Sequence, residues 1–327
     1  PLSLGQSSSS FFKLFDSAIS EQLVGVDHAC VFLSGGLDSS LLATSISSKL
    51  PGSTTSLSLS FPDFSRIDEH SSSAYVANSL CINHCTVPVT LSTLDHSFDD
   101  FIAHLDQPSI DGFNTFLISA AAVDYGFKVA FSGLGADELF YGYPHMTSSS
   151  NNCFVFSRLL RHHGVSRTRL KAILSRRFEY VKTQGFSAYE ISFYLKNTLL
   201  RDSDCFSQSQ GLELRVPFLD NSIVDYAISK STAEHLSSGP KSILYQLAVE
   251  LSLPIQQRPK QGFNLPLGHW LLSSSRFSPK RICRLLMPLS ISHESIWFSW
   301  LEMKISPRRY AAYWRWVVLA EWLVANS

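Results

Sequence analysis

The chain has 327 residues, 45% of them hydrophobic, and its 27 basic residues equal its 27 acidic ones in number. This length can bury a large core without disulfides, as one large domain or two ordinary ones. A neutral charge argues against nucleic acid and anionic membranes as partners, because both are bound through a basic excess. Apolar runs are shorter than the roughly 20 residues of a membrane span, and the start lacks a signal-peptide pattern. We therefore expect a cytoplasmic protein.

The six cysteines are scattered along the chain, which indicates reduced thiols. Cys81, His84 and Cys85 are close enough in sequence to suggest zinc. No second pair of ligands follows at the spacing of a zinc site, so we interpret the thiols as core residues.

Over the first 145 residues, short apolar runs alternate with segments of helix length, which is typical of a parallel sheet with crossover helices. We expect an α/β fold whose ligands bind at the carboxyl ends of the strands. In chain order, the predicted elements are a helix at 11–23, a strand at 29–33, a helix at 39–49, a strand at 56–60, a helix at 68–80, a strand at 84–87, helices at 91–105 and 115–125, and a strand at 128–132.

The character of the sequence changes after the polar stretch "TSSSNN" at 147–152, which is rich in turn-forming residues. Beyond it, helical patterns run to "AAYWRWVVLAEWLVA" at 311–325, whose apolar residues recur at helical spacing and predict a core helix. We therefore divide the chain into a nucleotide-binding α/β domain, 1–145, and a mainly helical part, 146–327, that completes the site.

The stretch "VFLSGGLDSSLLA" at 31–43 joins a predicted strand to a predicted helix through a polar, glycine-bearing loop. Gly35 and Gly36 allow backbone N–H groups to approach an anion closely, and the start of the following helix adds its positive end. Hydroxyl donors surround the glycines, namely Ser34, Ser39 and Ser40. These features predict a phosphate-binding loop, whereas an ordinary turn capped by Ser39 is the alternative.

Asp38 decides which kind of phosphate loop this is. The loop is neither a P-loop, because no Lys-Ser or Lys-Thr follows the glycines, nor a G-x-G-x-x-G motif. A carboxylate repels phosphate unless a divalent cation lies between them, so Asp38 indicates Mg²⁺.

Four motifs in order resemble one known family. "SGGLDSS" at 34–40 is similar to the pyrophosphate-binding (PP) loop of ATP pyrophosphatases. Three later stretches narrow the resemblance to the synthetase domain of the asparagine synthetase family, which includes β-lactam synthetases and lasso-peptide cyclases. They are "SGLGADELFYGY" at 132–143, "GLELRVPFLD" at 211–220 and "RPKQGFNLPLGHW" at 258–270. "HLDQPSIDGFNTFLIS" at 104–119 also resembles a family segment, and the whole implies a PP-loop (HUP) sheet followed by a helical half.

The resemblance also implies a reaction, its cofactors and its residues. In this family a substrate carboxylate is adenylated with ATP, pyrophosphate leaves, and ammonia or an amine then displaces AMP to form an amide. Asp38 and Asp137 match the carboxylates that hold Mg²⁺, and Lys260 matches the catalytic lysine. Glu138 is implied as support for the metal shell. The residues implied to bind ATP are Ser34, Gly35, Gly36, Asp38, Ser39, Ser40, Phe32, Leu59, Ser132, Gly133, Lys241 and Lys260.

The sequence departs from this family in several places. Nothing in it resembles the family's glutaminase domain, so nitrogen has to come from free ammonia, a separate glutaminase partner, a tethered domain missing from this chain, or another amine. Leu134 stands where Glu, Asp or Tyr is common and cannot accept a proton. Gln107 and Tyr141 replace a Glu and a Gly, and we expect both to reshape the acyl pocket.

These departures leave three hypotheses. The first is an amide synthetase acting on a small-molecule or peptide carboxylate. The second is an intramolecular cyclase that closes a lactam or a macrolactam. The third is a non-catalytic subunit that retains the fold.

Overall fold

The computed structural model describes residues 4–64, 68, 70–147, 185–253, 265–289, 291 and 293–327. Two sequence predictions fall outside or beside these ranges. Lys260 lies within 254–264, outside the described residues. The predicted domain boundary at 145/146 lies just before residues 148–184, which are also outside the described residues.

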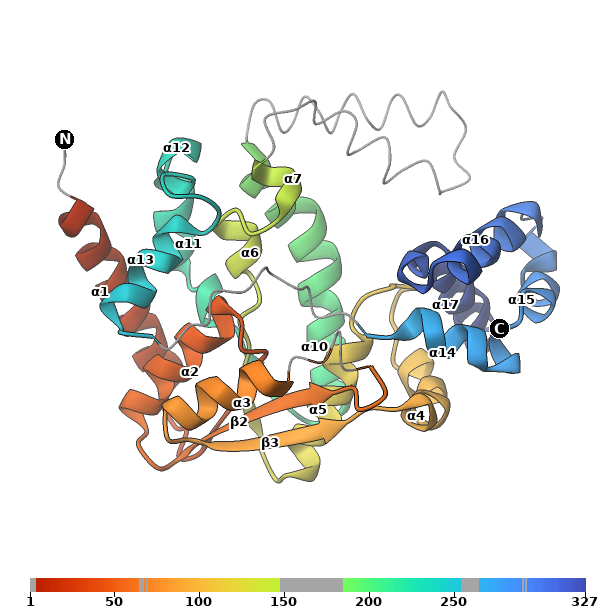
Figure 1. Cartoon of the computed structure of the whole chain (residues 1–327), viewed down its shortest axis with the longest axis horizontal. Helices are drawn as coiled ribbons and strands as arrows, with labels where there is room; N and C mark the ends of the chain where they lie inside the picture. Colours follow the sequence, from red (N-terminus) through yellow and green to blue (C-terminus); the bar gives the residue numbers. More distant parts are fainter. Residues whose placement is uncertain are drawn as a thin grey trace.

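A parallel five-stranded sheet forms the centre of the described structure, with the strand order β3-β2-β1-β4-β5 (Figure 1). In register, Cys30 pairs with Thr55 on one side and Ala130 on the other. The chain builds outward from β1 in one direction and then resumes on its other side with β4. The strands are β1 (Ala29–Phe32), β2 (Thr54–Ser60), β3 (Asn83–Pro88), β4 (Val129–Phe131) and β5 (Glu213–Arg215).

The predicted parallel α/β fold is therefore confirmed, with one omission. The four predicted strands correspond to β1 to β4. The fifth strand, β5, lies in "GLELRVPFLD", for which no strand was predicted.

Helices cover both faces of the sheet (Figure 1). The five helices predicted before residue 126 are present, although the first begins at Leu4 rather than near Phe11. They are α1 (Leu4–Gln22), α2 (Leu37–Lys49), α3 (His70–Ser79), α4 (Leu91–Ala103) and α5 (Phe113–Asp124). The later helices are α6 (Ala136–Leu139), α7 (Pro144–Thr147), a π-helix (Glu190–Leu199), α10 (Leu200–Ser209), α11 (Asn221–Ser229), α12 (Thr232–His235), α13 (Ser242–Glu250), α14 (Leu267–Ser273), α15 (Pro279–Leu286), α16 (His293–Ile305) and α17 (Ala311–Ala325).

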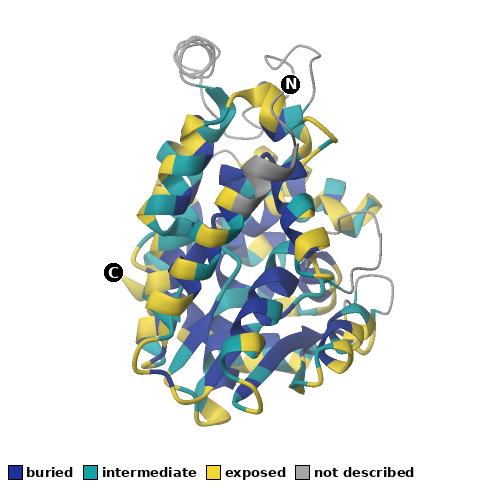
Figure 2. Cartoon of the chain, turned by 90° about the vertical axis from the view of Figure 1, so that its left-hand side faces the viewer, coloured by how far each residue is buried: buried dark blue, intermediate teal, exposed yellow. Residues whose placement is uncertain are grey.

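Two apolar clusters hold these layers together. Along β1, Cys30 belongs to one cluster and Val31 to the other, because successive strand residues point to opposite faces. Each cluster also draws on the later part of the chain, since Trp314 packs in the first and Leu244 in the second. Figure 2 shows the sheet and the inward helix faces as the buried interior. Both clusters thus contain residues from before and after the predicted boundary.

The helix α17 spans the residues predicted as a core helix, 311–325. Its Trp314 is 1% exposed and its indole Nε1 donates a hydrogen bond to the carbonyl oxygen of Ile110, at 3.0 Å. This contact ties the end of the chain to the loop before α5, which lines the cavity described below.

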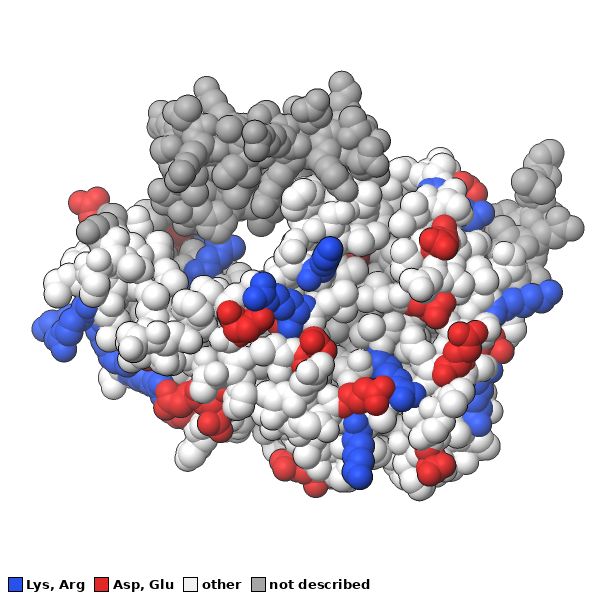
Figure 3. All heavy atoms as spheres, turned by 180° about the vertical axis from the view of Figure 1, so that it is seen from behind, with Lys and Arg blue, Asp and Glu red and all other residues white. Residues whose placement is uncertain are grey.

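The predicted neutral surface and core thiols can be compared with the structure. On the face seen in Figure 3, basic and acidic side chains are intermixed. Cys30 and Cys283 are buried, but Cys81 is exposed, so core packing does not explain every thiol. Within the described ranges, no helix has the length and apolar character needed to cross a membrane.

Candidate active site

A cavity of about 730 Å³ opens at the carboxyl ends of β1 and β4. These strands are the point at which the order of the sheet reverses direction, and in open α/β sheets ligands bind at such points. Loops after the two strands and the starts of α2, α5 and α6 line the cavity, together with α3, α10 and α13.

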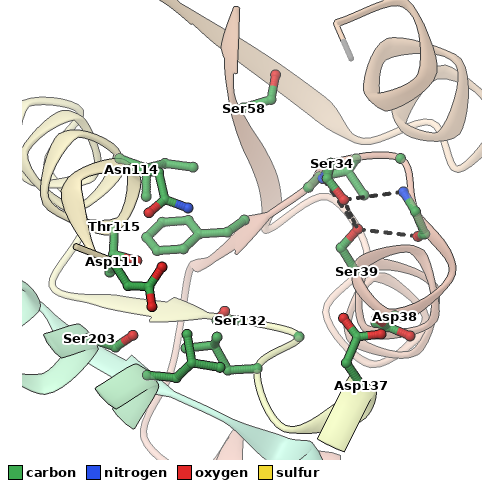
Figure 4. A pocket seen from close by; sticks show the side chains of 18 of the residues that line it. Ser34, Asp38, Ser39, Ser58, Asp111, Asn114, Thr115, Ser132, Asp137 and Ser203 are labelled. Carbon is green, nitrogen blue, oxygen red and sulfur yellow. Dashed lines mark hydrogen bonds between the residues drawn. The ribbon is translucent and has the colours of Figure 1, made fainter. Parts of the chain in front are cut away.

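The glycine loop after β1 is compact and its polar groups converge. The backbone N–H of Ser34 donates to Ser39 Oγ at 3.2 Å, and the Ser34 and Ser39 hydroxyls lie 3.1 Å apart (Figure 4). Gly35 has φ +76°, and a Cβ there would lie 2.6 Å from the backbone carbon of Ser72. The residue therefore has to be glycine. The loop delivers the chain to Leu37, where α2 begins and presents its positive end.

Of the predicted ATP-binding residues that the structure describes, most line the cavity, but two do not. Ser40 is fully buried behind the loop, and Leu59 packs in the core at 1% exposure. Ser58, the residue before Leu59, lines the cavity instead, because alternate strand residues face opposite sides. The lining residues are Phe32, Ser34, Gly35, Gly36, Asp38, Ser39, Ser132, Gly133 and Lys241. Contact between any of these residues and ATP remains a prediction.

The two carboxylates predicted to share a cation meet in the structure. Asp38 is in the first turn of α2 and Asp137 in α6, yet both face the same space (Figure 4). Lys241 Nζ lies 2.5 Å from Asp38 Oδ2 and 2.6 Å from Asp137 Oδ1. Both carboxylates therefore contact one cationic group, and we name Asp38 and Asp137 the metal pair.

Lys241 is held in its charged form by this contact. Burial lowers the pKa of Lys241, but the adjacent Asp38 and Asp137 raise it by more, so that its pKa lies above the ordinary value. The side chain is 7% exposed and reaches the pair from the residue before α13.

Gly142 leaves room for this arrangement. A Cβ at this position would lie 1.8 Å from Asp137 Oδ1 and 2.5 Å from Lys241 Cε. Any side chain here would displace the carboxylate or the lysine.

The metal pair fits Mg²⁺ bound to a nucleotide. Mg²⁺ is usually held by one or two carboxylates while phosphate oxygens and water complete its octahedral shell. Within the described residues, no group of three or more His, Cys, Asp or Glu side chains could hold a metal by itself. Two carboxylates at the edge of a phosphate loop match the nucleotide-bound arrangement.

Comparisons with known proteins give the family of this chain. Residues 11–280 match the family model described as asparagine synthase. The chain belongs to the asparagine synthase family. It is 24% identical over 299 residues to glutamine-hydrolyzing asparagine synthetase 1 of Bacillus subtilis, covering 73% of this chain and 46% of that one.

Two more matches give the extent of the likeness. The glutamine-hydrolyzing asparagine synthetase of Asparagus officinalis is 26% identical over 232 residues, covering 66% of this chain and 34% of the relative. The chain thus spans less than half the length of these curated relatives. Among solved structures, an NH3-dependent NAD synthetase from Campylobacter jejuni matches with a TM-score of 0.33 at 12% identity, covering 78% of this chain and 99% of that one.

Glu138 follows Asp137 of the metal pair in the sequence, but its carboxylate has a hydrogen-bond partner of its own. It is 1% exposed, and the Tyr143 hydroxyl donates to its carboxylate at 2.5 Å. Burial raises the pKa of Glu138 to about 7, although the Tyr143 hydrogen bond lowers it in part. The predicted role in the metal shell remains a prediction.

The three positions at which the chain departs from the family pattern lie in different surroundings in the structure. Leu134 lines the cavity, as expected for its motif. Gln107 lies behind the wall and donates to Asp202 Oδ1 at 3.3 Å, so it positions a lining residue. Tyr141 is 5% exposed and stacks on His235, with ring centroids 4.8 Å apart. Tyr141 is not among the described residues that line the cavity.

Sequence reasoning missed several polar residues on the far side of the cavity. Asp111 and Asn114 belong to the "DGFN" stretch at the start of α5, while Asp202 and Ser203 belong to α10. The first two fall within "HLDQPSIDGFNTFLIS", whose resemblance to a family segment could have pointed to them. The α10 residues carry no signal of their own, because only packing of α10 on α5 brings them to the cavity.

Proposed function

We propose that this protein adenylates a substrate carboxylate with ATP and transfers the acyl group to ammonia or an amine. The observation that carries the proposal is the convergence of Asp38 and Asp137 on one cationic group at the edge of the glycine loop. Family membership supports the same activity, since the relatives are named asparagine synthetases.

The first step is a displacement at phosphorus. A carboxylate oxygen of the substrate forms a bond to the α-phosphorus of ATP, and the bond from that phosphorus to the bridging oxygen of pyrophosphate breaks. Negative charge accumulates on the departing pyrophosphate, and neutralising it lowers the barrier. Bound Mg²⁺ supplies most of that neutralisation.

This chain's own groups bind and orient the triphosphate in the first step. The glycine loop offers backbone N–H groups together with the Ser34 and Ser39 hydroxyls, and the N-terminus of α2 adds a positive field. Asp38 and Asp137 would hold Mg²⁺, and the ammonium of Lys241 beside them would add positive charge for binding the phosphates. By the family resemblance, Lys260 would add a second positive charge.

The second step forms the amide. The nitrogen of the amine bonds to the acyl carbon, the bond from that carbon to the AMP oxygen breaks, and the nitrogen gives up a proton. Leu134 cannot take that proton, so the amine has to arrive neutral or give its proton to another group. We propose free ammonia, ammonia from a separate glutaminase, or a substrate amine as the nucleophile.

An intramolecular cyclase is the second candidate. The apolar Leu134 at the cavity wall favours it, because a tethered amine needs less help from a base when its effective concentration is high. A product smaller than its substrate by one water, formed without added amine, would identify this reaction.

Pyrophosphate release tests the adenylation. The purified chain is mixed with ATP, Mg²⁺, ammonia and a panel of carboxylic acids, with Asp137→Asn as the inactive control. We expect acid-dependent pyrophosphate from the wild type only. Absence of pyrophosphate with every acid, together with no heat of ATP binding in calorimetry, would indicate a non-catalytic subunit.

A further inference from the structure

The helix α16 exposes more large apolar side chains than any other described helix. Trp297, Phe298, Leu301 and Ile305 are all exposed, Phe298 at 59% and Ile305 at 81%, whereas no other described helix exposes more than two such side chains. Figure 1 shows α14 to α17 grouped at one side of the molecule. None of the four side chains is among the described residues that line the cavity, so the proposed reaction does not account for them.

These side chains lie on one face of the helix. Residues three or four apart in an α-helix are neighbours on its surface, and Leu301 is four residues from both Trp297 and Ile305 and three from Phe298. The opposite face is buried and consists of Ile296, Ser299 and Met303. We name the exposed side the outer face of α16, formed by Glu294, Trp297, Phe298, Leu301, Lys304 and Ile305.

The composition of α16 indicates that its outer face has a partner. A helix that is apolar on both sides is normally covered on both sides. Single exposed apolar residues are common, but a contiguous group of them marks an interaction surface. Trp297 packs edge to face on Trp300 of the same helix, with ring centroids 5.7 Å apart, and Lys304 Nζ lies 5.2 Å from the centroid of Trp300. Aromatic residues of this kind are enriched at the centres of protein interfaces.

The charges of the outer face lie at its two ends. Glu294 is in the first turn of α16 and Lys304 in the last, and each is five residues from Ser299, the midpoint of the helix. Trp297 and Leu301 are each two residues from the same midpoint. At 1.5 Å per residue, Glu294 and Lys304 of one chain are about 15 Å apart along the helix, too far to pair with each other. Among the described residues, neither has an ion-pair partner.

This arrangement is complementary to itself. When two copies of a helix are related by a two-fold axis at its midpoint, they run antiparallel, and residues equally far from the midpoint face each other. Glu294 of each copy then lies beside Lys304 of the other, and Trp297 lies near Leu301 of the other. A parallel pair would instead bring like charges together at both ends, so the charges favour the antiparallel pair.

We propose that the outer face of α16 binds the same face of a second copy of this chain as a two-fold symmetric, antiparallel helix pair. The apolar side chains form the centre of this interface, and two pairs of Glu294 and Lys304 form its ends, which is the usual division into an apolar core and a polar rim. A contact between identical faces closes on itself and therefore gives a dimer rather than a filament. The dimer does not depend on the proposed function, because the outer face lies outside the described cavity lining.

Sedimentation equilibrium over a hundredfold range of protein concentration tests the dimer. We expect the mass of the wild type to rise from that of one chain to that of two. Leu301→Lys puts two like charges at the centre of the interface and should weaken the dimer by at least a hundredfold, because charges buried without partners are strongly unfavourable. The matched control is Val249→Lys, since Val249 is 80% exposed on α13, and it should associate like the wild type.

Charge reversal tests whether the partner is a second copy in this orientation. Glu294→Lys places two lysines at each end of the helix pair, and Lys304→Glu places two glutamates there. Each variant alone should therefore associate about tenfold more weakly than the wild type, and the difference should shrink at high salt. An equal mixture of the two variants restores opposite charges at both ends, so we expect the mixture to dimerise like the wild type.

Several outcomes would overturn the inference. They are a mass of one chain at every concentration, a dimer that Leu301→Lys leaves intact, and a mixture of the charge variants that associates no better than either variant alone. Circular dichroism checks that each variant is folded, and if Leu301→Lys is not, the mixture of charge variants decides. A wild type that stays monomeric but sediments with vesicles of phosphatidylcholine and phosphatidylserine would assign the outer face to a lipid surface instead of a second copy.

Discussion

The two ends of the cavity each carry two carboxylates, but they are balanced in different ways. At the metal pair, Lys241 lies within 2.6 Å of both Asp38 and Asp137, so the protein supplies the counter-charge itself. On the opposite side of the cavity, which Asp111, Asp202 and Ser203 line and which we name the far wall, Asp202 is held by the neutral donors Ser109 and Gln107. The charge of Arg315 acts on Asp111 there, so Asp202 is the carboxylate of the four whose described hydrogen-bond partners are all neutral.

The difference follows from the elements that hold each end. The metal pair lies on α2 and α6, each of which begins directly after a strand of the sheet, so its position is fixed by the sheet edge. The far wall depends on α10 packing against α5. Loss of the metal pair should therefore abolish chemistry, while loss of the far wall should change selectivity.

Asp137→Asn should have the largest effect, because it removes one of the two charges proposed to hold the cation. We expect pyrophosphate release to fall by about a thousandfold, the size of effect seen when a group that stabilises transition-state charge is removed. Release is measured at saturating ATP over a range of Mg²⁺ concentrations. A variant that keeps wild-type activity would show that the pair holds no catalytic metal.

Gly142→Ala should be the next most damaging change, since a Cβ there would lie 1.8 Å from Asp137 Oδ1. The carboxylate or Lys241 has to move, and small displacements at a reacting centre cost about a hundredfold in rate. We expect a raised requirement for Mg²⁺ and a rate lowered by that factor.

The same mutation should leave the far wall, and so the selectivity among acids, unchanged. Near-normal pyrophosphate release in Gly142→Ala would mean that the arrangement around Asp137 tolerates displacement, and the contrast between the two ends would lose its basis.

The free energy of unfolding of Asp202→Asn tests whether the Asp202 carboxylate is destabilised by its burial. Burial raises the pKa of Asp202 to about 6 from 3.8, so between these values the unfolded chain loses its proton while the folded chain keeps it. Folding of the wild type is therefore penalised as pH rises, and the penalty is complete above about pH 6, at about 3 kcal/mol. Asparagine does not ionise.

The variant should consequently be more stable than the wild type at pH 8, and the difference should vanish towards pH 4. Urea unfolding at several pH values measures it. A difference that is constant with pH would mean that Asp202 is not a strained carboxylate in the free protein.

Ser34→Ala should have the smallest effect. It removes one hydroxyl donor, which lies 3.1 Å from Ser39 Oγ, while the backbone of the loop remains. A single hydrogen bond contributes about 1 kcal/mol, so we expect the KM for ATP to rise about fivefold with kcat nearly unchanged. Steady-state kinetics at saturating acid checks this, and a large loss of kcat would place Ser34 in the chemical step.

The sequence alone determined the parallel sheet and its first four strands. These depend on local signals, namely apolar runs of strand length bounded by loop residues. The pairing of Asp38 with Asp137 came from the family resemblance, and the two loops can meet because the carboxyl ends of parallel strands share one edge. The side chain of Leu59, a residue that the resemblance also implied, packs in the core, since a register of one residue decides which face a side chain takes.

Only the tertiary structure decided the rest of the cavity. Strand β5 was not predicted, and it pairs in parallel with β4 at the edge of the sheet. Asp202 and Ser203 face the cavity because α10 packs on α5, a contact between segments about 90 residues apart that no local pattern encodes. The periodicity of a helix shows which of its sides is buried. Whether that side packs against the core or lines a cavity depends on which other elements lie next to it in the fold.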